Sequence, residues 1–161
     1  MNPLKAKSIQ DHYPDEYSYC YGCGRLNEKG HQIKSYPDGE EAVAHFTPQP
    51  YYIAVPGFVY GGLIASLIDC HGIGTAAIAY NRAKGNEASS DSVPRYVTAS
   101  LQIDYLKPTP LGVELELRGK VLELKGRKAI SQVEVFANGS LTARGTVVAV
   151  QIPDSMTNTG K

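Results

Sequence analysis

The chain of 161 residues is long enough for a single sizeable hydrophobic core, and we expect residues 1–161 to form one domain. Hydrophobic residues make up 42% of the sequence and charged residues 20%, which is typical of a globular protein. The formal net charge is zero, so the chain lacks the basic surplus of a general nucleic-acid-binding protein, and no nucleic-acid partner is expected.

Near the N-terminus, residues 1–19 are polar and aromatic without clear periodicity, and they predict an arm or a short helix. They contain no apolar run of the kind found in secretory signals. Cys20, Cys23 and Cys70 are the three cysteines, a low and odd number that does not suit a disulfide framework. Both features favour a reducing compartment, and we expect a cytoplasmic protein.

The segment CYGCGRLNEKG, residues 20–30, predicts a glycine-rich loop. Its Cys20-x-x-Cys23 spacing is half of a zinc-binding motif, whereas a structural zinc site needs about four ligands. Other possible ligands are scattered and form no second closely spaced pair: His12, His31, Cys70 and His71. We therefore predict small buried cysteines in a turn, with no metal and no cofactor.

A hairpin is predicted next, with one strand near 31–36, a Pro-Asp-Gly turn and a second strand near 41–47. Residues 48–57 hold three prolines and a glycine, and they predict a loop. The apolar stretch that follows predicts a helix over about 60–80. Because this helix is apolar on nearly all sides, it is expected to be buried.

The same apolar stretch is about as long as the ~20 residues that a membrane-spanning helix needs. Asp69 and His71 lie at its centre, and it also contains four glycines. A central acid is costly in a bilayer, so we expect no membrane span. The buried helix of a globular core remains the better interpretation.

Residues 81–95 predict a surface loop. Four strands are then predicted, at 96–108, 112–124, 127–137 and 140–152. The second strand is expected to have a bulge at Gly119, and residues 153–161 are expected to form a frayed tail. In the first strand, strict alternation places Val97, Ala99, Leu101, Ile103 and Tyr105 on one face and Thr98 on the other. The whole pattern predicts an α+β fold in which a curved antiparallel sheet wraps around one long central helix.

The start of the central helix and the acid within it are the candidate site. A helix that begins near Tyr60 presents the unpaired N–H groups of Gly61 and Gly62, which suit an anion or a polarised carbonyl. Asp69 lies two turns further on, where an acid is costly unless it is paired or functional. Pairing with Arg95 or His71 is the structural alternative. Adjacent helix residues point about 100° apart, so Asp69, Cys70 and His71 are not expected to converge on one substrate, and we expect Cys70 in the core and His71 at a dimer interface.

The segments YGGLIASLID (60–69) and VTASLQIDYLKPTPLG (97–112) resemble hotdog-fold acyl-CoA thioesterases, especially the PaaI-like branch and the mammalian thioesterase superfamily members. Those proteins have a His-Gly-Gly at the helix start and an acid along the helix. A strand with a Ser or Thr and a Tyr-x-x-Pro ending follows. The loop at 20–30 is similar to a Cys-x-Gly-Cys-Gly segment of bacterial members, so the resemblance spans roughly residues 20–150.

This resemblance implies a hotdog fold and hydrolysis of an acyl-CoA substrate. Gly61 matches the glycine whose N–H polarises the thioester carbonyl, and Gly62 and Tyr60 adjoin it. Asp69 matches the general base or nucleophile, and Thr98 matches the Ser or Thr that places the attacking water. In the family, the glycine and the acid of one site come from opposite subunits, which implies a homodimer or a dimer of dimers.

Two positions depart from the family pattern. Tyr60 replaces the usual His, although its hydroxyl can still donate a hydrogen bond, and Ala54 stands about where some members have an Asn that holds the carbonyl or the water. These departures keep a non-catalytic acyl-CoA-binding homodimer as an alternative. A hotdog dehydratase or hydratase is another, but no His is present in the loop before the helix.

Further side chains are predicted to bind substrate. Tyr52 and Phe58 precede the helix and are expected to line the acyl pocket, and Ser66 shares the helix stripe that carries the acid. The basic residues expected near the CoA phosphates are Lys107, Arg127 and Lys128. The alternative for each of these basic residues is a solvated surface charge without a role in binding.

Overall fold

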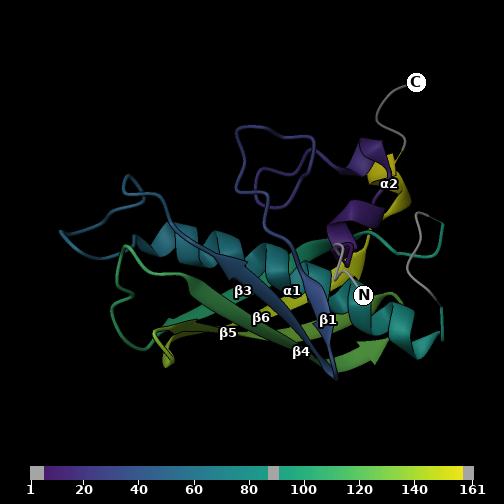
Figure 1. The fold of residues 1–161 in the computed structure, drawn as a ribbon. Helices are drawn as coiled ribbons and strands as arrows, with labels where there is room; N and C mark the ends of the chain where they lie inside the picture. Colours follow the sequence, from purple (N-terminus) through teal and green to yellow (C-terminus); the bar gives the residue numbers. More distant parts are fainter. Residues whose placement is uncertain (1–5, 87–90, 158–161) are drawn as a thin grey trace, which may run out of the picture.

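A computed structural model describes residues 6–86 and 91–157 (Figure 1). Two short 3-10 helices open the described chain, Ile9–His12 and Asp15–Tyr17, and the long helix α1 spans Gly61–Ala83. The strands are β1 (Tyr36–Asp38), β2 (Glu41–Phe46), β3 (Tyr96–Tyr105), β4 (Leu115–Lys125), β5 (Lys128–Ala137) and β6 (Ser140–Gln151), and a short helix α2 (Asp154–Thr157) follows.

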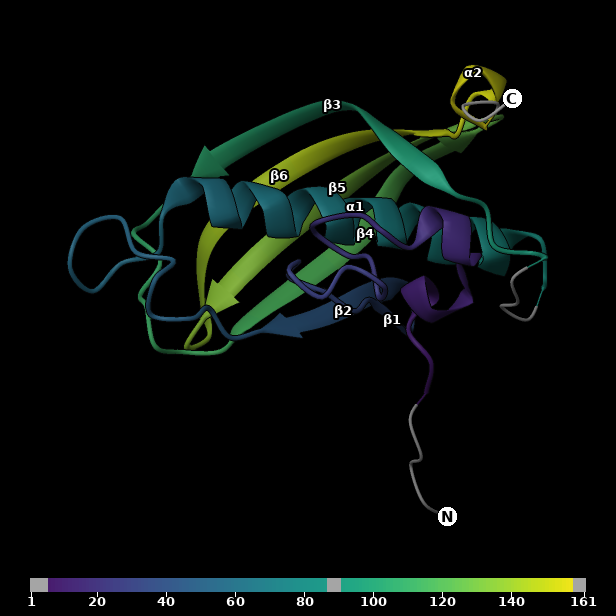
Figure 2. The same ribbon diagram turned by 90° about the horizontal axis from the view of Figure 1, so that it is seen from above.

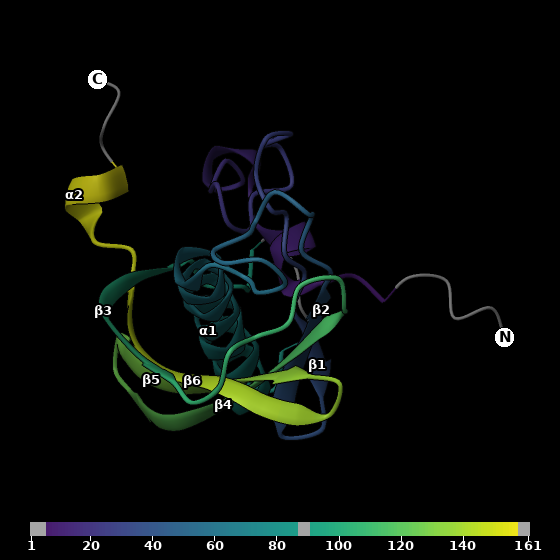
Figure 3. The ribbon, with the colours of Figure 1, turned by 90° about the vertical axis from the view of Figure 1, so that its left-hand side faces the viewer.

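Within these described ranges, six strands form one antiparallel sheet in the order β1-β2-β4-β5-β6-β3. The sheet curves around α1, as the view along the helix shows (Figure 3). The N-terminal segment, residues 6–30, packs on the side of α1 that the sheet leaves open (Figures 2 and 3). This arrangement confirms the predicted curved antiparallel sheet around one central helix.

Helix α1 is buried because small residues let it approach the sheet closely. A Cβ on Gly72 would lie 2.5 Å from a methyl carbon of Val147 on β6, and one on Gly119 of β4 would lie 2.1 Å from the Thr75 hydroxyl. Residues Gly61–Lys84 are long and apolar enough to cross a membrane, yet 72% of the apolar window is buried inside the protein. The length and apolar character of α1 therefore match its place in the core.

Several predicted boundaries need correction. The strand near 31–36 is wrong, because β1 begins only at Tyr36 and the preceding backbone bonds to the N-terminal segment: Ile33 N–H donates to Gly22, and Ser35 N–H donates to the Gln10 side chain. Gly119 is not a bulge, since the irregularity of β4 lies between Val121 and Glu123. The tail after residue 153 includes one helical turn, α2, and residues 158–161 lie outside the described ranges, as does part of the predicted 81–95 loop.

Strand β3 contains a bulge that changes which side chains face the helix. The pairing register with β6 shifts between Thr98 and Ser100, so strict alternation along the strand is wrong. Thr98 contacts α1 through Asp69, and Tyr105 contacts it through Gly61, although seven positions separate the two strand residues. An uninterrupted strand would have placed them on opposite faces.

Candidate active site

The N-terminus of α1 is open, as predicted. Tyr60 is the N-cap, with extended backbone (φ −72°, ψ 146°), and no described side chain caps the first turn. The Tyr105 hydroxyl donates to the Gly61 carbonyl at 2.8 Å, and a Cβ on Gly61 would lie 3.2 Å from the Tyr105 ring. The ring of Tyr60 covers Gly62, where a Cβ would lie 2.4 Å away. Two tyrosines therefore flank the first turn of α1, Tyr105 at Gly61 and Tyr60 at Gly62.

Asp69 meets Thr98 across the gap between α1 and β3. The Thr98 hydroxyl donates to the Asp69 carboxylate at 2.5 Å. Asp69 is half-buried, whereas Thr98 is exposed on the edge strand of the sheet. The hydrogen bond joins the acid to the residue that was predicted to place the attacking water.

The surroundings of Asp69 make its carboxylate more basic. Burial raises the pKa of Asp69 above its ordinary value, and the nearby Cys20 raises it further. The hydrogen bond from Thr98 and the positive charge of Arg95 both lower this pKa, but burial has the largest effect. Of the two structural partners considered above, Arg95 acts only as a nearby charge. The direct partner of the carboxylate is Thr98.

The neighbours of Asp69 on the helix point elsewhere. His71 is fully buried and is held by Ser35 at 2.8 Å and by the Ala42 carbonyl at 3.1 Å, so its predicted place at a subunit interface is wrong. Burial lowers the pKa of His71 to about 4, and it is neutral at pH 7. Cys70 is buried as predicted and contacts Cys20. The consecutive residues Asp69, Cys70 and His71 therefore contact three different partners and do not converge on one point.

The acid and the open amides form two half-sites on one chain. Gly61 and Asp69 are eight residues apart on α1, which places them about 12 Å apart along the helix axis. A carbonyl carbon and its attacking oxygen react from about 3–3.5 Å. One substrate carbonyl therefore cannot use Gly61 and Asp69 of the same chain.

The predicted substrate-binding residues Tyr52, Phe58 and Ser66 divide in the same way. Phe58 is 38% exposed and pairs with Pro110. Tyr52 is half-buried, and its hydroxyl lies 3.0 Å from a ring nitrogen of His31. Ser66 is half-buried and faces Gly22 in the Cys20–Cys23 loop. Tyr52 lies beside the helix start, because the Tyr60 N–H donates to its carbonyl at 3.1 Å, and Ser66 lies nearer the acid.

The predicted phosphate-binding residues lie at opposite ends of β3. Lys107 follows the strand and lines a hollow of about 320 Å³ that it shares with Gly61 and Tyr105. Lys128 pairs with Val150, at the other end of the sheet, beside the start of β3. About 30 Å of strand separates the two ends. Arg127 and Lys128 are exposed, and Arg127 donates to the Ile152 carbonyl at 2.8 Å. One chain therefore does not bring Lys107 together with the other two.

Comparison with known proteins decides the family. A family model described as the thioesterase superfamily matches residues 56–144, which is more than half of the chain and includes both half-sites. This chain belongs to the thioesterase superfamily. A thioesterase superfamily protein from Shewanella loihica PV-4, of known crystal structure, is 49% identical, with a TM-score of 0.66 over 86% of this chain and 98% of that one.

More distant relatives agree with this hotdog-fold family. The PaaI protein of E. coli is 17% identical and has a TM-score of 0.61 over 76% of this chain and 81% of its own, so the likeness there is one of fold. Acyl-coenzyme A thioesterase THEM4 of Xenopus laevis is 34% identical over 93 residues. That match covers 58% of this chain and 36% of THEM4, so the chain spans only about a third of this curated relative.

Sequence reasoning missed two features of the site. Tyr105 was assigned only to the alternation of its strand, but it anchors the carbonyl of Gly61. The Tyr-x-x-Pro strand ending was the available signal. Cys20 and Cys23 come within reach of Cys70, the residue after the acid, and nothing in the spacing of the three cysteines indicated this.

Proposed function

We propose that this superfamily member hydrolyses acyl-coenzyme A thioesters to a free acid and coenzyme A, with Asp69 as base or nucleophile. The observation that carries the proposal is the hydrogen bond from the Thr98 hydroxyl to the half-buried Asp69 carboxylate. A carboxylate with a raised pKa beside a hydroxyl is suited to hold and activate a water molecule. Membership of the superfamily supports thioester chemistry, and the frog relative carries the name acyl-coenzyme A thioesterase.

In the base mechanism, Asp69 removes a proton from water as its oxygen attacks the thioester carbonyl carbon. The N–H groups at the start of α1 stabilise the oxyanion that forms. The carbon–sulfur bond then breaks, and the thiolate of coenzyme A leaves and takes up the proton. In the nucleophile mechanism, the Asp69 carboxylate attacks the carbonyl carbon first and the carbon–sulfur bond breaks as the thiolate of coenzyme A leaves. Water then hydrolyses the resulting anhydride, which releases the acid and restores the carboxylate. Both routes require the same carboxylate and the same open amides.

The site is proposed to form between two chains. Asp69 and Gly61 lie about 12 Å apart along one helix, so each needs the complementary half-site from a partner copy. Strand β3 offers the surface for this pairing, because it is a ten-residue edge strand whose residues 98–102 are all exposed. Edge strands of this length readily pair with another strand.

An antiparallel β3–β3 contact would join the two half-sites. If the two-fold axis passes between Leu101 and Gln102, Thr98 lies opposite Tyr105 of the partner copy. Thr98 is hydrogen-bonded to the acid, Asp69, and Tyr105 is hydrogen-bonded to Gly61 at the start of the helix. The proposed homodimer therefore builds two identical sites at its centre, and a dimer of dimers remains compatible with it.

Complementation tests this shared site. Asp69→Asn and Gly61→Pro chains are each expected to be nearly inactive alone. When the two are co-expressed, half of the dimers are mixed and each mixed dimer has one intact site, so about a quarter of the wild-type activity should return. Thiol release by the co-purified chains measures this. Activity no greater than that of the separate variants would show that one chain supplies the whole site.

Thr98→Val is expected to lower kcat about tenfold, because it removes the hydroxyl that positions the carboxylate and the water. Thr98→Ser is the matched control and should keep most of the activity. Initial rates of thiol release at saturating substrate provide the measurement. Equal rates for the valine and serine variants would contradict a role for the hydroxyl.

The activity itself is tested with short, medium, long and aryl acyl-coenzyme A thioesters and the wild-type chain. Release of coenzyme A thiol from at least one of them is expected. Tight binding without turnover would favour the non-catalytic acyl-CoA-binding homodimer. Tyr60 and Ala54, which depart from the family pattern, would then be the first positions to exchange for His and Asn.

A further inference from the structure

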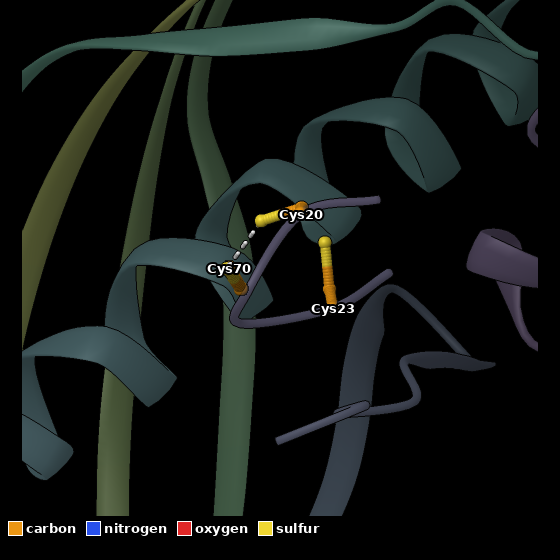
Figure 4. Close-up of side chains that lie close together, drawn as sticks. All are labelled: Cys20, Cys23 and Cys70. Atoms are coloured by element: carbon orange, nitrogen blue, oxygen red, sulfur yellow. Dashed lines mark hydrogen bonds between the residues drawn. The ribbon is translucent and has the colours of Figure 1, made fainter. Parts of the chain in front are cut away.

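The three cysteines converge beside the acid of the helix. Cys20 and Cys23 lie on the N-terminal loop and Cys70 on α1, and their sulfur atoms all lie within 4.8 Å of one another (Figure 4). The Cys20 and Cys70 sulfurs are 3.8 Å apart, and all three thiols are free. Cys23 and Cys70 are buried, and Cys20 is half-buried. Cys70 lies 50 positions after Cys20 in the sequence.

The loop is shaped so that these sulfurs can meet. A Cβ on Gly22 would lie 2.3 Å from the Cys70 sulfur, so only glycine lets the loop approach α1 this closely. The Gly24 N–H donates to the Cys20 carbonyl at 2.7 Å and closes the turn.

The polar surroundings of the cluster also indicate a ligand. The Tyr13 hydroxyl is fully buried and has no hydrogen-bond partner among the described residues, although it lies within electrostatic reach of all three thiols. The guanidinium of Arg95 packs over the Tyr13 ring at 5.0 Å and also interacts with the three thiols. An unpartnered buried donor and a cation thus flank the sulfur cluster, as would suit negatively charged thiolates.

We propose that Cys20, Cys23 and Cys70 bind one zinc ion through their thiolates, with water or a small ligand in the fourth position. Zinc–sulfur bonds of about 2.3 Å in a tetrahedral site place the sulfurs about 3.8 Å apart, which agrees with the Cys20–Cys70 separation. Three thiolates and Zn²⁺ carry one net negative charge, and Arg95 offsets it. Cu⁺ would leave two negative charges beside a single cation.

Zinc would fasten the N-terminal loop to the helix one residue beyond Asp69. Such a metal stabilises the folded chain, because an unfolded chain cannot hold three ligands this far apart in sequence. Removal of zinc with a chelator is expected to lower Tm by about 5–10 °C. None of the three proposed zinc ligands takes a direct part in the proposed hydrolysis, so zinc binding is tested separately from activity.

The test uses the full-length chain, purified under reducing conditions without chelator. Atomic emission should find about one zinc per chain, and the metal-free chain should bind Co²⁺ with a thiolate-to-cobalt absorption band in the near ultraviolet that zinc abolishes. Cys20→Ser and Cys70→Ser should each weaken zinc binding at least about tenfold. Tyr19→Ser is the matched control, because Tyr19 is 61% exposed beside Cys20, and it should bind zinc normally.

Thiol labelling of the wild-type chain tests the proposal even if a cysteine variant does not fold. Zinc should slow the labelling of all three thiols in the wild-type chain. The proposal is overturned if the reduced wild-type chain binds no zinc, if zinc leaves labelling unchanged, or if folded Cys70→Ser binds zinc as tightly as wild type. A Cys20–Cys70 disulfide in place of zinc, in protein isolated without added oxidant, would also overturn it.

Discussion

Asp69→Asn is expected to lower kcat for acyl-coenzyme A hydrolysis about 10³-fold, within the range that a positioned acid or base contributes. Asparagine has the same shape and can still accept the hydrogen bond from the Thr98 hydroxyl. It cannot take a proton from water or attack a carbonyl as a carboxylate does. The variant therefore removes the acid–base and nucleophilic chemistry of Asp69 while it keeps the shape and the hydrogen bond of the side chain.

The measurement is thiol release at saturating substrate, with Tm recorded to confirm that the variant is folded. Glu123→Gln is the matched control, because Glu123 is an exposed acid on β4, which β5 and β6 separate from β3, and its activity should be unchanged. KM should change little in Asp69→Asn, because the carboxylate acts mainly in the transition state. A variant that keeps a third or more of wild-type kcat would refute Asp69 as base or nucleophile.

Gly61→Pro is expected to lower kcat about 10²-fold, because it removes an N–H group that stabilises the oxyanion. Proline fits the first position of a helix, and the extended backbone of Tyr60 suits a residue that precedes proline. The helix should therefore form normally in the variant. Its activity should fall while its folding is retained.

Gly61→Ala is the control for the added bulk. Alanine brings the same Cβ, 3.2 Å from the Tyr105 ring, but it keeps the N–H group. We expect the alanine variant to retain most of its activity in the thiol-release assay. Equal losses in the proline and alanine variants would assign the effect to displacement of Tyr105 and would refute the oxyanion role of the amide.

The local pattern of the sequence was enough to predict the central architecture. A long apolar stretch needs a covering sheet, and alternating strands with short turns supply one, so α1 and β4 to β6 appear near their predicted positions. The strand expected near 31–36 was wrong because its backbone bonds to the N-terminal segment instead of to a neighbouring strand. Strand propensity does not reveal which distant segment competes for those hydrogen bonds.

For the candidate site, the acid on an apolar helix and the glycines at its start could be predicted from the sequence, because both depend only on spacing along one element. The other contacts follow from packing between elements. The bulge in β3 turns Thr98 toward Asp69 and Tyr105 toward Gly61, against the alternation of the strand. The fold also brings Cys20 and Cys23 next to Cys70, which lies 50 positions after Cys20. Such contacts depend on how separate elements pack, and no local period in the chain encodes that packing.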